Sequence, residues 1–131
     1  MDLGLIMNNI KESDKLIIIL LDGPYISQYA DMGYEIAKSA LNLRYNVKIF
    51  LYMDGVHLPR KEQNPMACPD VADNITKLID KGCEVKACIR CAAARGYSDE
   101  TDYVAGVKIT SVYDLGEWMD REDTKVITLG R

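Results

Sequence analysis

Glu84-Val-Lys-Ala-Cys88-Ile-Arg-Cys91-Ala-Ala-Ala-Arg95-Gly96 is the most informative stretch of the chain, because it joins a strand pattern directly to a helix pattern. Residues 84–88 predict a short strand. The three alanines and the arginine that follow predict one or two helical turns, which end at Gly96. The two cysteines of this stretch are therefore expected where a strand ends and a helix begins.

On both sides of this stretch, strand-like and helix-like runs alternate along the chain. We expect further strands at 15–21, 46–53, 106–109 and 125–129, with helices at 27–43, 70–82 and 111–119. This alternation predicts a single-domain α/β fold, a three-layer sandwich in which a five-stranded parallel sheet is flanked by helices. The segment 54–69 contains three prolines and is expected to be a long loop that frames a site.

The length of 131 residues fits one domain, which we place at 15–131 after an N-terminal extension at 1–14. The extension has no basic residue ahead of its apolar ones, so it does not resemble a signal peptide. The most apolar run, 16–21, is far shorter than the ~20 residues that span a bilayer. We therefore expect a cytoplasmic protein that does not enter a membrane.

The charge pattern argues against a nucleic-acid partner. Sixteen Lys and Arg residues stand against twenty Asp and Glu residues, which gives a formal net charge of −4. The largest basic groups are the pair Arg60-Lys61 and the spaced Lys86, Arg90 and Arg95, whereas nucleic-acid binding normally requires a wide basic surface.

Cys88 is the candidate nucleophile. In an open α/β sheet, ligands bind beyond the carboxyl ends of the strands, where Cys88 is expected. A thiol at the start of a helix meets unpaired backbone N–H groups, which favour the reactive thiolate. Arg90 and Arg95 are candidate substrate-binding residues that would stabilise the same negative charge. Cys91 should lie one helical turn further in, so we expect Cys88 to be the more exposed and the more acidic thiol.

The remaining candidates carry less weight. Cys68 and Cys83 are expected to be structural or without a role. The four cysteines supply a single C-x-x-C pair rather than the paired knuckles of a zinc ribbon, so no metal site is expected. His57 is the one histidine of the chain, and we consider it as a general base or as a contact to a bound thiol. No organic cofactor is expected.

The order of strand, C-x-x-C and helix is also the thioredoxin arrangement, which makes a dithiol oxidoreductase an alternative function. The thioredoxin fold itself is disfavoured, because the motif here follows two strand–helix units and no proline follows Pro69. Dithiol chemistry of Cys88 and Cys91 on another fold remains open. So does a non-catalytic oligomeric binding protein in which both cysteines are structural.

Taken together, the stretch from Cys88 to Gly96, Gly23-Pro24 after the first strand and Tyr52-Met-Asp-Gly-Val56 after the second resemble the DsrE/TusD (DsrE/DsrF-like) family of small sulfur-relay proteins. The resemblance covers roughly residues 15–129. It implies the DsrEFH-like fold, a five-stranded parallel sheet between helices, and assembly as a homotrimer or homohexamer.

The resemblance also implies a function. A cysteine after the third strand, which corresponds to Cys88, would accept sulfur from a donor protein as a persulfide and pass it to an acceptor protein. Cys91 departs from the single-cysteine carriers and is similar to family members with C-x-x-C. It would release the sulfur by forming a disulfide with Cys88, share the sulfur, or serve a redox role. The expected activity is that of a sulfurtransferase-type persulfide carrier.

Overall fold

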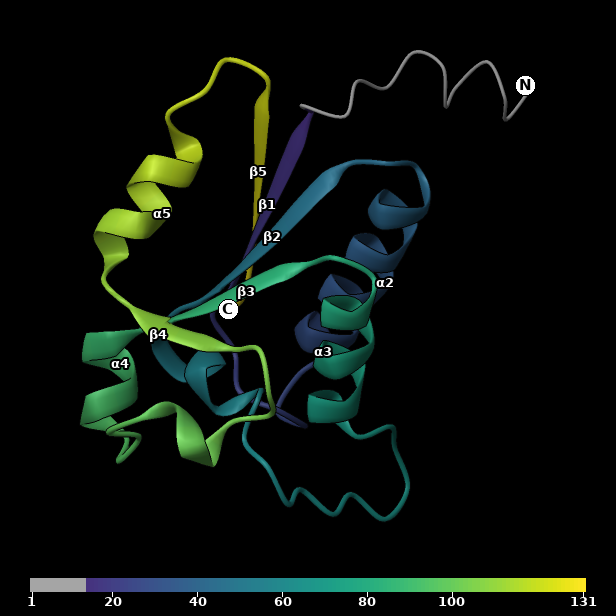
Figure 1. Cartoon of the computed structure of the whole chain (residues 1–131). Coiled ribbons are helices and arrows are strands. Elements are labelled where there is room, and N and C mark those ends of the chain that lie inside the picture. Colours follow the sequence, from purple (N-terminus) through teal and green to yellow (C-terminus); the bar gives the residue numbers. More distant parts are fainter. Residues whose placement is uncertain (1–13) are drawn as a thin grey trace.

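The computed structural model describes residues 14–131, so most of the N-terminal extension expected at 1–14 lies outside the described residues. Within the described part, five parallel strands form one sheet in the order β4-β3-β2-β1-β5 (Figure 1). The strands are β1 (Lys15–Leu20), β2 (Asn46–Leu51), β3 (Glu84–Cys88), β4 (Lys108–Thr110) and β5 (Thr124–Leu129). The predicted α/β class and the five-stranded parallel sheet are confirmed.

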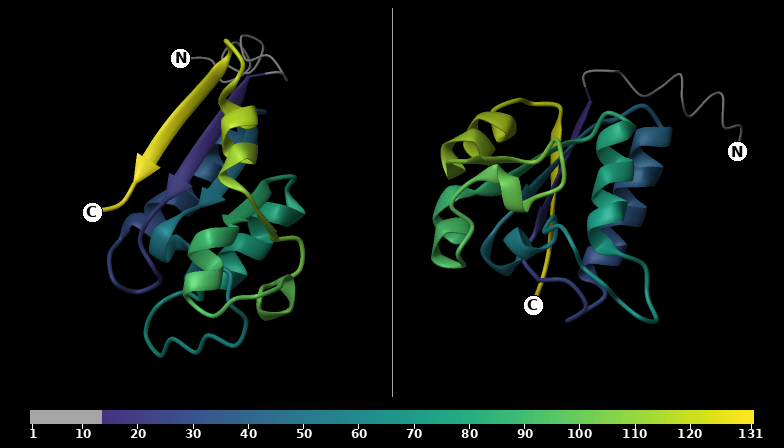
Figure 2. Two further views of the ribbon diagram at one scale, coloured as in Figure 1. Left: turned by 90° about the vertical axis from the view of Figure 1, so that its left-hand side faces the viewer. Right: turned by 60° about the horizontal axis from the view of Figure 1, so that its bottom comes forward.

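Helices cover both faces of this sheet, which makes the predicted three layers. Helices α2 (Tyr29–Asn42) and α3 (Val71–Asp80) lie on one face, and α4 (Ile89–Ala94) and α5 (Val112–Met119) lie on the other (Figures 1 and 2). The central strands are apolar on both sides because both faces are covered. Ile17, Ile18 and Ile49 illustrate this, since each is at most 1% exposed.

Small side chains bring α2 close to the sheet. Ala30, Gly33, Ala37 and Ala40 are buried on its inner face. A Cβ at Gly33 would lie 2.8 Å from a methyl carbon of Leu20, so a larger residue there would push the helix outward. The small side chains on this face therefore allow the close packing.

The end of the second strand and the segment after it differ from the prediction for local reasons. The second strand ends at Leu51 rather than at residue 53, because Met53 adopts the left-handed region with φ 52°. The segment expected as a loop from residue 54 instead opens with a 3-10 helix, η1 (Met53–His57). A second 3-10 helix, η2 (Glu100–Asp102), precedes β4.

The third strand passes into α4 without a connecting turn. Cys88 is both the last residue of β3 and the N-cap of α4, and the helix begins at Ile89. The predicted meeting of strand end and helix start at the cysteines is therefore confirmed. Ser111 caps α5, and its hydroxyl oxygen accepts a hydrogen bond from the Tyr113 N–H.

Candidate functional site

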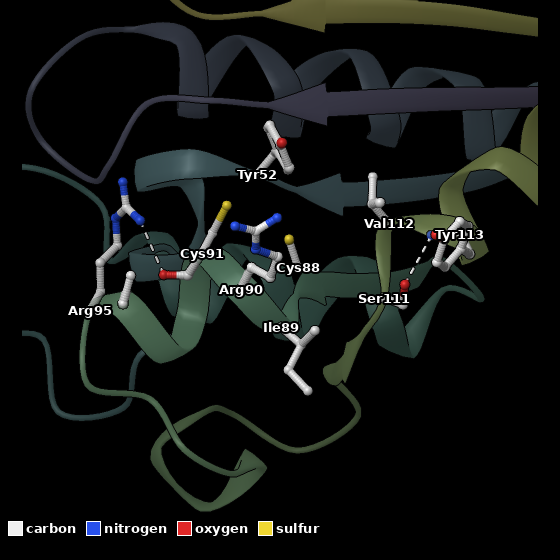
Figure 3. A pocket seen from close by; sticks show the side chains of 10 residues that line it. Tyr52, Cys88, Ile89, Arg90, Cys91, Arg95, Ser111, Val112 and Tyr113 are labelled. Atoms are coloured by element: carbon white, nitrogen blue, oxygen red, sulfur yellow. Dashed lines mark hydrogen bonds between the residues drawn. The ribbon is translucent and has the colours of Figure 1, made fainter.

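The carboxyl ends of β2, β3 and β4 together form a pocket of about 540 Å³ that contains both cysteines of the motif (Figure 3). Tyr52 follows β2, the cysteines stand at the β3–α4 junction, and Ser111 follows β4. Neighbouring parallel strands end at the same edge of a sheet, which is why residues so far apart in the sequence meet here. The lining residues are Tyr52, Cys88, Ile89, Arg90, Cys91, Ala94, Arg95, Ser111, Val112 and Tyr113.

Both thiols lie at the floor of this pocket. Cys88 is 3% exposed and Cys91 is 8% exposed, so the expectation that Cys88 is the more exposed of the two is wrong. The reason is that Cys88 still belongs to β3 and packs in the hydrophobic core. In Figure 3 both sulfur atoms point to the same side of α4, toward Tyr52.

The environment of Cys91 favours its protonated form. Burial raises the pKa of the Cys91 thiol, and the neighbouring Cys88 thiol raises it further through a hydrogen bond and its charge. The backbone N–H of Met53 and the charge of Arg95 act in the opposite direction. A thiol of this kind is a weaker nucleophile at neutral pH than one that is free to ionise.

Arg95 is held in place by other parts of the protein rather than left free for a substrate. Its Nε donates to Asp54 Oδ1 at 2.8 Å, and a terminal guanidinium nitrogen donates to the Cys91 carbonyl oxygen at 3.1 Å (Figure 3). Arg95 thereby links η1 to α4. It lines the pocket, but its main contacts fix the backbone of the helix that carries Cys91.

Arg90 has the opposite character. Its side chain is exposed, and within residues 14–131 it makes no hydrogen bond or ion pair. Arg90 stands between the two cysteines in the sequence, and its side chain lines the same pocket (Figure 3). Of the two arginines predicted as substrate contacts, Arg90 is thus the one whose guanidinium is available to an incoming anion.

The structure does not bring His57 into the cysteine pocket. His57 lines a separate pocket of about 410 Å³ together with Tyr25, Arg60 and Tyr97. Its Nδ1 lies 2.7 Å from the Tyr97 hydroxyl oxygen, and burial lowers the pKa of the imidazole. This places the histidine in a cluster with the rings of Tyr97 and Tyr103 rather than in the thiol pocket.

The other two cysteines are apart from the site. Cys83 is buried, and its burial raises the pKa of the thiol to about 12. Cys68 is exposed in the proline-containing segment. Among the described residues, no group of three or more His, Cys, Asp or Glu side chains is placed to hold a metal ion. No helix of residues 14–131 is long and apolar enough to cross a membrane.

Several residues of the site were not predicted from the sequence. Tyr52 and Ser111 follow β2 and β4, the two neighbours of β3, so the rule that parallel strands end at one edge would have found them once the strand order was known. Asp54 is different, since its role depends on a contact with Arg95 across 41 positions of sequence. The left-handed backbone of Met53 has no signal in its residue type.

Solved structures with the same architecture include the YchN protein of Escherichia coli. It superposes with a TM-score of 0.75 at 23% identity, over 88% of this chain and 98% of that one. A protein of unknown function from Methanobacterium thermoautotrophicum superposes with a TM-score of 0.64 at 18% identity, over 88% and 99% of the two chains. These likenesses establish the fold.

Sequence relatives extend the comparison. An uncharacterized protein of Methanopyrus kandleri is 36% identical over 86% of this chain and 93% of its own length. An uncharacterized protein of Methanocaldococcus jannaschii is 33% identical over 86% and 97% of the two chains. The DsrE/DsrF-like family matches residues 14–129, which is nearly all of the described chain. The chain therefore belongs to the DsrE/DsrF-like family, which is associated with sulfur relay between partner proteins.

Proposed function

We propose that this protein carries sulfur as a persulfide on Cys88 and passes it to an acceptor protein. The observation that carries the proposal is the placement of Cys88 at the floor of a pocket, at the carboxyl end of β3 and next to the Arg90 guanidinium, which has no partner within residues 14–131. Membership in a family associated with sulfur relay supports the same chemistry.

The proposed transfer consists of two thiol exchange steps. The Cys88 thiolate attacks the outer sulfur of a donor persulfide, forms Cys88–S–SH, and releases the donor as its thiolate. The acceptor thiolate then attacks the outer sulfur of Cys88–S–SH, becomes the new persulfide, and restores the Cys88 thiolate. One sulfane sulfur atom moves in each step. The thiol that receives it is oxidised and the persulfide that gives it up is reduced to the same extent, so no external oxidant or reductant is needed.

The pocket supplies what this chemistry needs. The low exposure of the two thiols limits their contact with dissolved oxidants and with other thiols. A persulfide formed on Cys88 is therefore protected from unwanted reactions. Helix α4 has only six residues, so its N-terminus contributes little positive potential. Among the described residues that line the pocket, the Arg90 guanidinium is therefore the main positive group available to an anion.

Cys91 gives the pocket a second reaction, because its thiol lines the same pocket and interacts with the neighbouring Cys88 thiol. If the Cys91 thiolate attacks the inner sulfur of Cys88–S–SH, a Cys88–Cys91 disulfide forms and hydrosulfide leaves. The dithiol is then oxidised by two electrons and the outer sulfur is reduced. The same contact supports the alternative function, a dithiol oxidoreductase, in which the pair cycles without carrying sulfur.

We further propose that the working unit is a homotrimer or homohexamer in the cytoplasm, with a protein partner as the sulfur acceptor. Light scattering at micromolar concentration tests the assembly. A monomer under these conditions would contradict this part of the proposal.

The proposed function is tested by loading the reduced protein with polysulfide and measuring bound sulfane sulfur as thiocyanate after cyanolysis. We expect Cys88→Ser and Cys88→Ala to lose loading. Cys83→Ser is the matched control, because it changes another buried cysteine outside the pocket. Cys91→Ser should still load and should hold its sulfur longer than the wild type when no acceptor is present.

Two results would contradict this proposal. Full loading of both Cys88 variants would show that another residue carries the sulfur. Reversible formation of a Cys88–Cys91 disulfide with no sulfur bound at any stage would favour the dithiol oxidoreductase.

A further inference from the structure

Resting on the proposed persulfide chemistry, we propose that the pocket accepts its sulfur from a small organic persulfide that carries an anionic group, and that Arg90 binds this group. The proposal concerns the donor side of the reaction only. It combines the size of the pocket, the chemistry of its walls, its charges and the depth of its thiols.

The pocket is larger than an inorganic sulfur donor requires. Its volume of about 540 Å³ falls within the ~300–1,000 Å³ that is usual for sites that hold organic molecules. A hydrosulfide or a short polysulfide ion would leave most of this space to water. A carrier with several carbon atoms would fill it.

The walls are suited to the carbon part of such a carrier. Ile89, Val112 and Tyr113 line the pocket and are exposed, and the ring of Tyr52 lines it from the end of β2 (Figure 3). Contact with a bound alkyl chain would remove part of this apolar surface from water, which favours binding. A bare inorganic ion makes no such contact.

The charges of the pocket favour an anion. None of the described residues that line it is Asp or Glu. Of its two cations, Arg95 is paired with Asp54, whereas Arg90 has no partner within residues 14–131. A guanidinium binds a carboxylate through two parallel hydrogen bonds, so Arg90 can anchor the carrier at the end away from the sulfur.

The depth of the thiols favours a thin reactant that can enter the pocket. Cys88 lies at the pocket floor and is nearly inaccessible to solvent, so the donor sulfur has to enter on a narrow group. With the carboxylate on Arg90, a carrier R–S–SH would present its outer sulfur to the Cys88 thiolate. The products are Cys88–S–SH and the carrier thiolate, so atoms and electrons balance.

The test uses two persulfides of nearly equal size that differ in charge. The persulfide of mercaptopropanoate carries an anionic carboxylate, and the persulfide of mercaptopropanol carries a neutral hydroxyl group. Initial rates of loading on Cys88 are measured against the concentration of each. We expect the KM of the wild type to be about five- to tenfold lower for the anionic carrier, as one exposed arginine–carboxylate pair allows.

Variants separate the guanidinium from the general charge of the protein. In Arg90→Gln the ratio of the two KM values should fall close to one, and Arg90→Lys should restore part of it. Lys77→Gln is the matched control, because it removes one exposed positive charge from α3, on the other face of the sheet, and should leave the ratio unchanged.

Each contrary outcome has a distinct meaning. Equal KM values in the wild type, or a ratio that Arg90→Gln does not change, would overturn the inference. Loading by a persulfidated sulfurtransferase but by neither small persulfide would also overturn it, while leaving the proposed function intact. Failure of every donor to load Cys88 would remove the proposed function together with the inference.

Discussion

The link from Asp54 through Arg95 to the Cys91 carbonyl should hold α4 in place, and removing it should loosen the helix that carries Cys91. Arg95→Gln breaks both hydrogen bonds of the guanidinium. The Asp54 side chain is 59% exposed, so the ion pair contributes only ~0.2–1 kcal/mol. The bond from the charged guanidinium to the Cys91 carbonyl contributes roughly 1 kcal/mol more, since Arg95 is 23% exposed.

These values give an ordered expectation. Arg95→Gln should lower the free energy of unfolding by about 1–2 kcal/mol, which for a domain of this size lowers Tm by roughly 4–8 °C. Asp54→Asn removes only the charge of one partner and should cost less than about 1 kcal/mol. In the double variant the two costs should overlap by about 0.5 kcal/mol, because both changes break the same ion pair.

Urea unfolding of the wild type and of the three variants measures how much each variant loses in free energy of unfolding. Alkylation of Cys91 under native conditions reports the local effect, and it should be faster in Arg95→Gln than in Asp54→Asn. Two results would refute the reasoning. In the first, Asp54→Asn costs as much as Arg95→Gln, and in the second, Cys91 is alkylated at the wild-type rate in both variants.

Three further predictions concern the rest of the fold. In Gly55→Ala the new Cβ would lie 2.1 Å from the Leu20 carbonyl oxygen, so thermal unfolding should show a severe loss of stability. Gly116 in α5 has open space around it, so Gly116→Ala should raise the free energy of unfolding by ~0.5–1 kcal/mol. An unchanged Tm for Gly55→Ala would contradict this packing. Burial lowers the pKa of His57 below its ordinary value of 6.5, so the unfolded state binds the proton more readily. The stability from His57 should be complete above pH 6.5 and decrease as pH falls through and below it, and His57→Gln should remove this part of the pH dependence measured in urea. Cys83, with a pKa of about 12, should resist iodoacetamide at pH 8 until the protein unfolds, and its alkylation in the native state would contradict the assigned burial.

The sheet could be predicted from the sequence because its strands are buried on both faces. A strand such as β1 needs an unbroken apolar run, and that run appears directly in Leu16-Ile-Ile-Ile-Leu20. The α3 helix could also be predicted, because Asp70 caps it with its own side chain and lies next to the helix in the sequence. Features determined by neighbours in the chain were therefore predicted well.

The details of the site depend on contacts between residues that are distant in the sequence, and these contacts could not be predicted from the sequence. The sequence places Arg95 near the cysteines, but its engagement by Asp54 follows from how η1 packs beside α4. The burial of Cys88 follows from the direct passage of β3 into α4. The separation of His57 from the thiol pocket follows from its contact with Tyr97, across 40 positions of sequence.

The central claim, that Cys88 carries the sulfur, is tested most directly by tryptic mapping of the loaded wild-type protein. Trypsin cleaves after Lys86, Arg90 and Arg95, so Cys88 falls in the peptide 87–90 and Cys91 in the peptide 91–95. Cys68 and Cys83 lie in two further peptides, so each thiol is read separately by mass spectrometry after persulfides are blocked by alkylation. We predict one additional sulfur atom on peptide 87–90. Additional sulfur on peptide 91–95 alone, or on none of the four peptides, would contradict the claim.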